Sequence, residues 1–212
     1  MRISVVIFAL VLAGVGAGQA CGENAGPAGA QANGQDGRQD AGQNAVPDEA
    51  AATVHEPPLQ LMIEVEVPAP LPVVWKAFTT SEGLSTWLTP NAVVDLRPGG
   101  EWTAHFPGGS TGGGSIVSFV LEKEIVLAAL APDKFPEVRA QRTRVVFQFE
   151  ARGDSTIVRL TQTGWKRGDE WTHAYEYLLA GNAQLMATLH KRFVDGPLDW
   201  EKLFGDSPAP RK

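Results

Sequence analysis

Cysteine is almost absent from this chain of 212 residues, which carries a single one at position 21. A lone cysteine excludes a disulfide bond within the chain. Clusters of basic residues are missing too, and 24 acidic residues outnumber 18 basic ones. Proteins that bind nucleic acids gather basic residues on one surface, because contacts with the phosphate backbone supply much of the affinity. We therefore expect no nucleic-acid partner.

A phosphate-binding glycine loop is also missing, although glycine is frequent at residues 98–100 (PGG) and 107–115 (PGGSTGGGS). Such a loop needs the N-terminus of a helix directly behind it, so that free backbone amides face the anion. Here both glycine clusters lead into stretches typical of strands, and the second lacks the lysine of a phosphate loop. We interpret both clusters as turns and expect no cofactor.

Recognisable catalytic and metal-binding motifs are absent as well. A nucleophilic triad needs a serine or cysteine together with a histidine and an orienting acid, and the four histidines stand in no such pattern. His173 and Glu176 are three residues apart, but no further histidine follows at coordinating spacing. We interpret them as a solvated pair. The sequence therefore favours a protein with no catalytic residues and no metal site.

The chain begins with a pattern typical of an export signal. Arg2 precedes an apolar stretch over residues 3–15, and small residues follow up to position 20. This pattern predicts a secretory signal peptide over residues 1–20, which is too short for a comfortable membrane span. The alternative is a buried N-terminal helix, but the stretch has neither a helix cap nor an amphipathic period. We expect export to the periplasm or the cell envelope.

Cys21 follows this signal directly and allows two interpretations. Gly18 and Ala20 suit ordinary signal-peptidase cleavage. A thiol at the cleavage point suits a lipoprotein, whose cysteine is acylated and becomes the N-terminus, although the leucine or valine usual three positions earlier is missing. We favour lipidation of Cys21, because an unpaired thiol in an oxidising compartment otherwise has no evident role. That lipid anchor would be the only contact with a membrane.

Residues 21–55 contain no aromatic side chain and are rich in glycine, alanine, glutamine and asparagine. Such a segment cannot bury enough apolar surface to offset the entropy lost on ordering. We therefore expect a disordered tether over residues 21–55. A folded domain follows over residues 56–205, and residues 206–212 form a flexible tail.

The first part of the domain combines a strand with short helices. Apolar residues alternate with polar ones over positions 59–67, which predicts a half-buried strand of an antiparallel sheet. Val74, Trp75 and Phe78 then lie at helical spacing behind a proline-rich start, and Ser81 can cap a second short helix.

The rest of the domain predicts further strands and one long helix. Alternation returns in several runs between residues 92 and 163, with Gly153 and Asp154 at the tip of a hairpin. Over residues 169–193 apolar residues recur every three or four positions, behind an acidic start and before Gly196. This stripe needs a partner, and only the sheet is large enough. We expect an α+β domain whose curved antiparallel sheet wraps around a long C-terminal helix.

Four segments resemble the family of activator-of-heat-shock-protein-ATPase homologues, within the SRPBCC or START-like superfamily. They are VPAPLPVVWKAFTTSEGLSTWL, VVDLRPGGEW, STIVRLTQTGW and RFVDGPLDWEK, in this order. The resemblance implies a helix-grip fold, often with a cavity between sheet and helix. It implies fold better than function, since members bind hydrophobic ligands, act as cyclases or aromatases, or stimulate a cytosolic chaperone. The signal peptide and tether depart from the family's usual pattern.

The candidate ligand site consists of aromatic residues that could converge between the helix and the sheet, together with two helix residues that leave room and offer a polar group. These are Trp75, Phe78, Trp87, Trp102, Phe106, Phe119, Phe147, Phe149, Tyr175, Gly181 and Asn182. Each aromatic residue could equally be ordinary core. We expect a noncatalytic protein that binds a small apolar molecule. The alternatives are an enzyme of the cyclase or aromatase type and a protein-interaction module that resembles the chaperone regulators.

Overall fold

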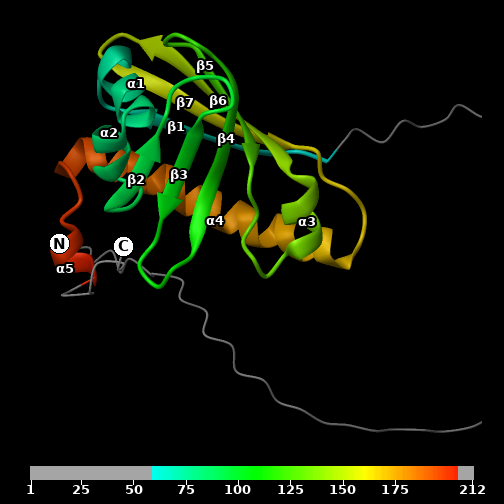
Figure 1. Ribbon diagram of the computed structural model, residues 1–212. Coiled ribbons are helices and arrows are strands. Elements are labelled where there is room, and N and C mark those ends of the chain that lie inside the picture. Colours follow the sequence, from blue (N-terminus) through cyan, green and yellow to red (C-terminus); the bar gives the residue numbers. More distant parts are fainter. Residues whose placement is uncertain (1–58, 205–212) are drawn as a thin grey trace, which may run out of the picture. The chain divides into compact units, whose positions relative to one another are not determined.

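The computed structural model describes residues 59–204, which form one antiparallel sheet and five helices (Figure 1). The strands are β1 (Leu61–Val67), β2 (Asn91–Val94), β3 (Glu101–His105), β4 (Thr111–Val120), β5 (Glu124–Ala129), β6 (Thr143–Arg152) and β7 (Ser155–Thr163). The helices are α1 (Leu71–Thr79), α2 (Ser81–Ser85), α3 (Pro136–Gln141), α4 (Asp169–Asp195) and α5 (Trp200–Phe204). The predicted signal peptide, tether and tail, and Cys21, lie outside these described residues.

The seven strands are paired in the order β1-β7-β6-β5-β4-β3-β2, and every neighbouring pair is antiparallel. The predicted hairpin is present between β6 and β7, where Gly153 turns the chain with a φ of 60°. Even positions of β7 face inward: Thr156, Val158 and Leu160 are buried. The alternation in the sequence therefore sets which face of the sheet packs on α4.

The long helix α4 crosses the concave inner face of the sheet (Figure 1), as the apolar stripe predicts. Asp169 and Glu170 lie in its first turn, where carboxylates interact favourably with the free backbone amides. Gly196 follows the last turn with a φ of 93°, a conformation in which a side chain would be strained. Among the strands, α4 approaches β1 most closely, and its first turns lie beside α3.

Two short helices close one end of the sheet. Pro72 stands at the start of α1, where its missing N–H costs no helical hydrogen bond. The Thr80 hydroxyl, rather than the predicted Ser81, caps α2 by accepting a bond from the amide of Gly83 at 2.9 Å. The indole of Trp87 donates to the carbonyl of Ala77 at 2.9 Å and so ties the end of α2 to α1.

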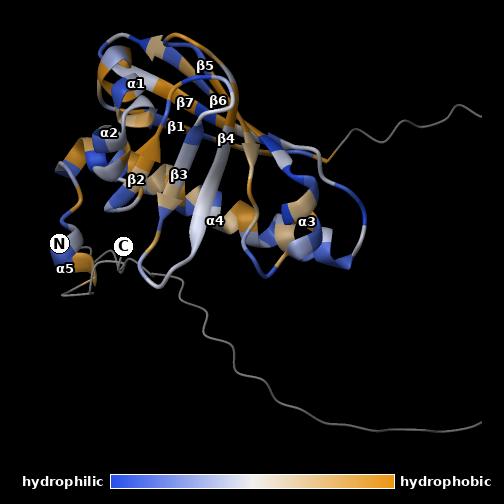
Figure 2. Ribbon diagram, in the orientation of Figure 1, coloured by the Kyte–Doolittle hydropathy of each residue, from blue (hydrophilic) through white to orange (hydrophobic). Residues whose placement is uncertain are grey.

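The second glycine cluster departs from the prediction that it forms a turn. Only residues 106–110 turn, whereas Gly112, Gly113 and Gly114 lie inside β4. A Cβ atom on Gly113 would overlap the carbonyl oxygen of Trp102, and one on Gly114 would overlap that of Ala128. Glycine is thus required here because the neighbouring strands lie too close for a side chain. Figure 2 shows this part of β4 nearly white, between the hydrophilic and hydrophobic extremes.

The core of the described residues consists of two clusters. The larger cluster lies between the sheet, α1, α2 and the second half of α4, and it includes Phe78, Met186 and Leu189. The smaller cluster joins α3 to the first turns of α4 through Val138 and Trp171. The helices α3 and α5, both short, were not predicted. None of the helices described here is long and apolar enough to span a membrane.

Candidate functional site

Six aromatic residues of the predicted ligand site converge at the end of the sheet that α1 and α2 close. They are Trp75, Phe78, Trp87, Trp102, Phe147 and Phe149, and all six are buried. The ring of Phe78 lies at their centre, 5.1 Å from that of Phe147 and 5.0 Å from that of Phe149, centroid to centroid. These separations are typical of aromatic rings in direct contact. The six rings therefore fill this end of the domain with one another.

Two of the three indole N–H groups in this aromatic group, those of Trp87 and Trp102, donate hydrogen bonds within the protein. The indole of Trp102 donates to the carbonyl of Phe78 at 2.8 Å, in addition to the bond between Trp87 and Ala77. Buried groups whose hydrogen bonds are complete are costly to rearrange. The group consequently has the character of a rigid core.

The other three predicted aromatic residues lie apart from this group. Phe119 and Tyr175 are half-buried at the margin of the larger cluster. The Tyr175 hydroxyl donates to the carbonyl of Gln60 at 3.2 Å, and its ring contacts that of Trp165. Phe106 belongs to neither cluster, and its ring covers Gly112: a Cβ atom there would lie 3.2 Å from the Phe106 ring.

The two predicted residues of α4 lie midway along the helix. Gly181 is exposed, and a Cβ atom built on it would meet no other atom within 4 Å. Asn182 is half-buried, and its Nδ2 donates to Oε1 of Gln162 at 2.8 Å. Gly181 therefore lies at the exposed side of α4, and Asn182 offers a polar group at the middle of the helix.

Gln162 extends this polar contact into the protein interior, and sequence analysis did not select it. Its side chain is 2% exposed, and its Nε2 donates to the Thr143 hydroxyl at 2.8 Å. A chain of hydrogen bonds thus runs from Thr143 through Gln162 to Asn182. One feature of the sequence could have identified Gln162: it is a polar residue at an inward position of β7, paired with Leu61 of β1.

Small residues of the sheet and an apolar residue of α4 lie outside both core clusters. On the sheet side these are Ala104 of β3 and Gly112 of β4, which are paired residues of the same face. On the helix side Leu178 takes an inward position between Ala174 and Leu185, yet it is only half-buried and packs in neither cluster. We call this part of the protein the inter-cluster region. Its composition permits apolar contacts and one polar contact at Asn182.

Metal binding finds no support in the described part of the chain. Within residues 59–204, no three histidine, cysteine, aspartate or glutamate side chains gather closely enough to hold an ion.

Lys134 has a lowered pKa because partial burial disfavours its charge, although its Nζ lies 3.4 Å from the centre of the Tyr177 ring. Attraction to that ring favours the charged form of the lysine. Lys134 therefore stabilises the contact of α4 with the loop that precedes α3.

Solved structures from several organisms share this architecture. The Aha1 dimer of Colwellia psychrerythraea is 19% identical, with a TM-score of 0.54, and the match covers 65% of this chain and 98% of that one. A protein of Mesorhizobium loti is 17% identical, with a TM-score of 0.56 and coverages of 66% and 100%. An HSP90 activator of Plasmodium falciparum is 20% identical, with a TM-score of 0.52 and coverages of 66% and 98%. At these identities the likeness establishes the fold.

Sequence comparison places the chain more specifically. No curated protein matches it. The model of the family described as "Activator of Hsp90 ATPase homolog 1-like protein" matches residues 68–191, which includes α1, α2, all strands from β2 to β7 and most of α4. This match spans more than half of the chain and confirms the resemblance seen in the sequence. The chain therefore belongs to the Activator of Hsp90 ATPase homolog 1-like family, with its START-type fold.

Proposed function

We propose that the domain binds a small, mostly apolar molecule in the inter-cluster region and does not transform it. The observation that carries this proposal is the state of Leu178. Its neighbours along the stripe, Ala174 and Met186, are buried, whereas Leu178 is half-buried and packs in neither core cluster. Partly exposed apolar surface at the edge of the core is the kind of surface that a ligand can cover.

The sheet side of the inter-cluster region supports the same proposal. Gly112 presents no side chain to the helix, and only the Phe106 ring covers it. A phenyl ring at a half-buried position outside the main core can change rotamer at modest cost. We propose that the ligand takes the place of this ring over Gly112 and contacts Leu178 from the other side.

Asn182 would orient the ligand. Its Nδ2 is bonded to Gln162, while its Oδ1 accepts no hydrogen bond from any described residue. A ligand with one hydroxyl or amide donor could bond to this oxygen and lay its apolar body along α4. Few, well-placed polar groups in an apolar site are the usual arrangement for orienting a small molecule.

Binding without reaction is supported by the side chains of the interior. The buried polar residues of the described chain are Thr89, Thr143, Thr156 and Gln162. None of these four side chains ionises near neutral pH. General acid–base chemistry needs an ionisable group whose pKa the site has shifted. The cyclase or aromatase alternative therefore has less support than binding.

The test is a fluorescence titration of the full chain with Nile red, a neutral apolar probe. Gly181→Leu adds a bulky side chain beside Leu178 and should weaken binding about tenfold or more. Ala180→Leu is the matched control, because it adds the same side chain at an exposed position on the opposite side of α4 and should leave the affinity unchanged. Phe106→Ala should strengthen binding, because it removes the ring that covers Gly112.

The proposal fails if Gly181→Leu and Ala180→Leu bind the probe as the natural chain does. It also fails if Phe106→Ala binds no more tightly, because the probe would then occupy another surface. Circular dichroism of each variant separates a lost site from a lost fold.

We further propose that the protein is exported and anchored through a lipid on Cys21. The support is the apolar stretch of residues 3–15 and the lone thiol behind it. The intact mass of the protein purified from its native cells tests this. We expect cleavage before Cys21 and added acyl mass. A product that retains Met1 would disprove export, and an unmodified cysteine would disprove anchoring.

A further inference from the structure

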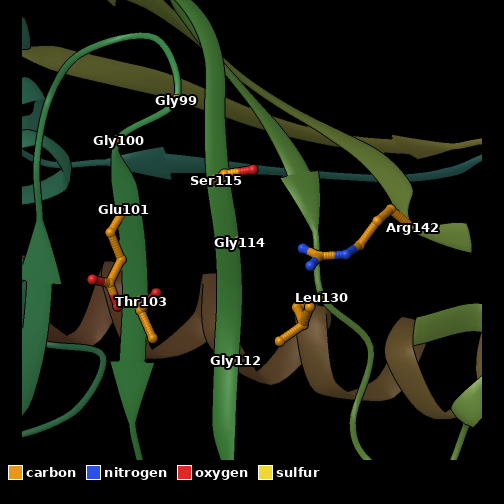
Figure 3. Close-up of a pocket in the computed structure, with 9 residues that line it drawn as sticks. All are labelled: Gly99, Gly100, Glu101, Thr103, Gly112, Gly114, Ser115, Leu130 and Arg142. Carbon is orange, nitrogen blue, oxygen red and sulfur yellow. The ribbon is translucent and has the colours of Figure 1, made fainter. Parts of the chain in front are cut away.

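The outer face of the sheet carries a hollow of about 250 Å³ over β3 and β4, on the side away from α4 (Figure 3). Its walls come from the turn before β3, from β3 and β4, and from the residues that flank the β5–β6 connection. They include Glu101, Thr103, Ser115, Leu130 and Arg142. The hollow shares Gly112 with the inter-cluster region but lies on the other face of the sheet, and its charged and hydroxyl groups belong to other residues, so an inference about it does not depend on the proposed function.

Strand register brings two arginines to this face. Glu101 of β3 is paired with Ser115 of β4, Ser115 with Ala128 of β5, and Ala128 with Arg144 of β6. Arg142 precedes Arg144 by two residues and lines the hollow itself. Arg142 therefore lies at one side of the hollow and the carboxylate of Glu101 at the other, while Arg144 belongs to the same face of the sheet but does not line the hollow.

Neither arginine side chain is engaged within the protein. No hydrogen bond or ion pair joins the guanidinium of Arg142 or Arg144 to any of residues 59–204. In Figure 3 the Arg142 side chain extends from the start of β6 toward Gly114 in the middle of β4. Other arginines of the described chain have carboxylate partners, such as Arg159 with Glu64 and Arg139 with Asp133. The guanidinium groups of Arg142 and Arg144 are therefore available to a ligand.

Two glycines of β4 at and beside the floor of the hollow cannot be replaced by residues with a side chain. Substitution of Gly114 would make its Cβ overlap the carbonyl oxygen of Ala128, and Gly113 has a φ of 103° besides its overlap with Trp102. The hollow is thus a fixed consequence of how β3, β4 and β5 pack.

The backbone of Arg142 is strained in the position that places its side chain here. Its φ is 61° and its ψ is 148°, a conformation populated almost entirely by glycine. The position ends α3 and begins β6, where glycine would relieve the strain. Strain of this kind is concentrated at functional sites.

We propose that this hollow binds the oxyanion group, carboxylate or phosphate, of a small molecule. Arg142 supplies the charge, and the hydroxyls of Thr103 and Ser115 supply neutral donors. Guanidinium groups suit both oxyanions because their N–H groups match the spacing of two oxygens. Glu101 disfavours a second anionic group at the opposite wall, so the ligand carries its oxyanion at one end only.

The test is a titration of the ¹⁵N-labelled full chain, followed by NMR, with sodium phosphate in one arm and sodium acetate in the other. Sodium chloride keeps the ionic strength constant. We expect saturable shifts of the amide signals of Thr103, Gly114 and Ser115 and of the Arg142 side-chain N–H. The arm with the tighter saturation identifies the kind of oxyanion.

Arg142→Gln should weaken binding about tenfold or more. Lys76→Gln is the control, because it removes the same charge from an exposed position on α1 and should change the affinity less than about twofold. Arg142→Gly gives a second measurement: we expect it to raise Tm by about 2–4 °C through relief of strain, while the saturable shifts disappear.

Three results would overturn the proposal. The first is an absence of saturation in both arms, and the second is saturable binding that survives Arg142→Gln. The third is an equal loss of affinity in Arg142→Gln and Lys76→Gln, which would show attraction to the overall charge of the protein and not to this hollow.

Discussion

The apolar stripe of α4 has the same helical spacing throughout, but its ends and its middle are buried to different degrees. Trp171 and Ala174 near the start and Leu189 near the end are at most 1% exposed, whereas Leu178 and Asn182 between them are half-buried. The difference comes from the residues that face the stripe. The start of the stripe packs against α3 and its end packs in the larger cluster with the aromatic group, whereas Leu178 packs in neither cluster. Periodicity therefore determines which way a helix faces, and the partner surface determines how much of it is buried.

The largest expected change in stability comes from replacing a leucine by alanine at the end of the stripe, and the same substitution in its middle tests the comparison. Leu189→Ala should destabilise the domain by about 2–5 kcal/mol, because it leaves a cavity in the larger core cluster. Leu178→Ala should cost less than about 1 kcal/mol, because few contacts are lost. Urea denaturation of both variants measures the difference. Equal losses would show that the middle of the stripe is packed as tightly as its end.

A smaller loss of stability is expected for the hydrogen bonds that connect Thr143, Gln162 and Asn182. Gln162→Leu keeps the size of the side chain but removes the partner of Thr143 and of Asn182, and it should cost about 1–3 kcal/mol. Asn182→Ala should destabilise the domain less. Asn182 is half-buried, so it lies closer to water than Gln162 does. Denaturation midpoints of the two variants test this order. A larger loss for Asn182→Ala would contradict it.

The sequence predicted the architecture because the architecture depends on patterns that do not require knowledge of distant contacts. The alternation in β1 and β7 and the spacing in α4 each follow from local geometry. The short helices α3 and α5 lack such a pattern. Residues distant in sequence hold α3 in place: Glu170 accepts hydrogen bonds from the amides of Glu137 and Val138 at 2.7 and 3.1 Å.

The candidate site was harder to predict from the sequence for the same reason. Of the nine aromatic residues expected to converge, six are buried together and three lie apart, and the sequence could not show which of them contact one another. The role of Gly113 and Gly114 was also hidden, because it depends on the distance between neighbouring strands. Arg142 looks like any surface arginine until its φ and its lack of a partner among the described residues are known.

Glu170 provides a test at the other end of the stripe. Glu170→Gln should destabilise the contact between α3 and α4 by about 0.5–1 kcal/mol, because a charged acceptor at the start of a helix becomes a neutral one. The loss should shrink at high salt concentration, since half-exposed charges are screened. Hydrogen exchange of the amides of Glu137 and Val138 should become faster. Unchanged exchange there would mean that the carboxylate does not hold α3.

The smallest expected effect is a gain of stability at Gly181. Alanine is favoured over glycine in a helix interior by about 1 kcal/mol, because glycine loses more conformational freedom when the helix forms. A Cβ atom at this position meets nothing within 4 Å, so no steric cost offsets that gain. Gly181→Ala should therefore raise the free energy of unfolding by about 0.5–1 kcal/mol.

The same substitution at Gly83 should destabilise the domain, since the added Cβ would overlap the carbonyl oxygen of Lys76. Thermal melts of the two variants decide the point. A loss of stability in Gly181→Ala would show that the middle of α4 lies against the sheet more tightly than its half-buried side chains indicate, and the site proposed there would have no room.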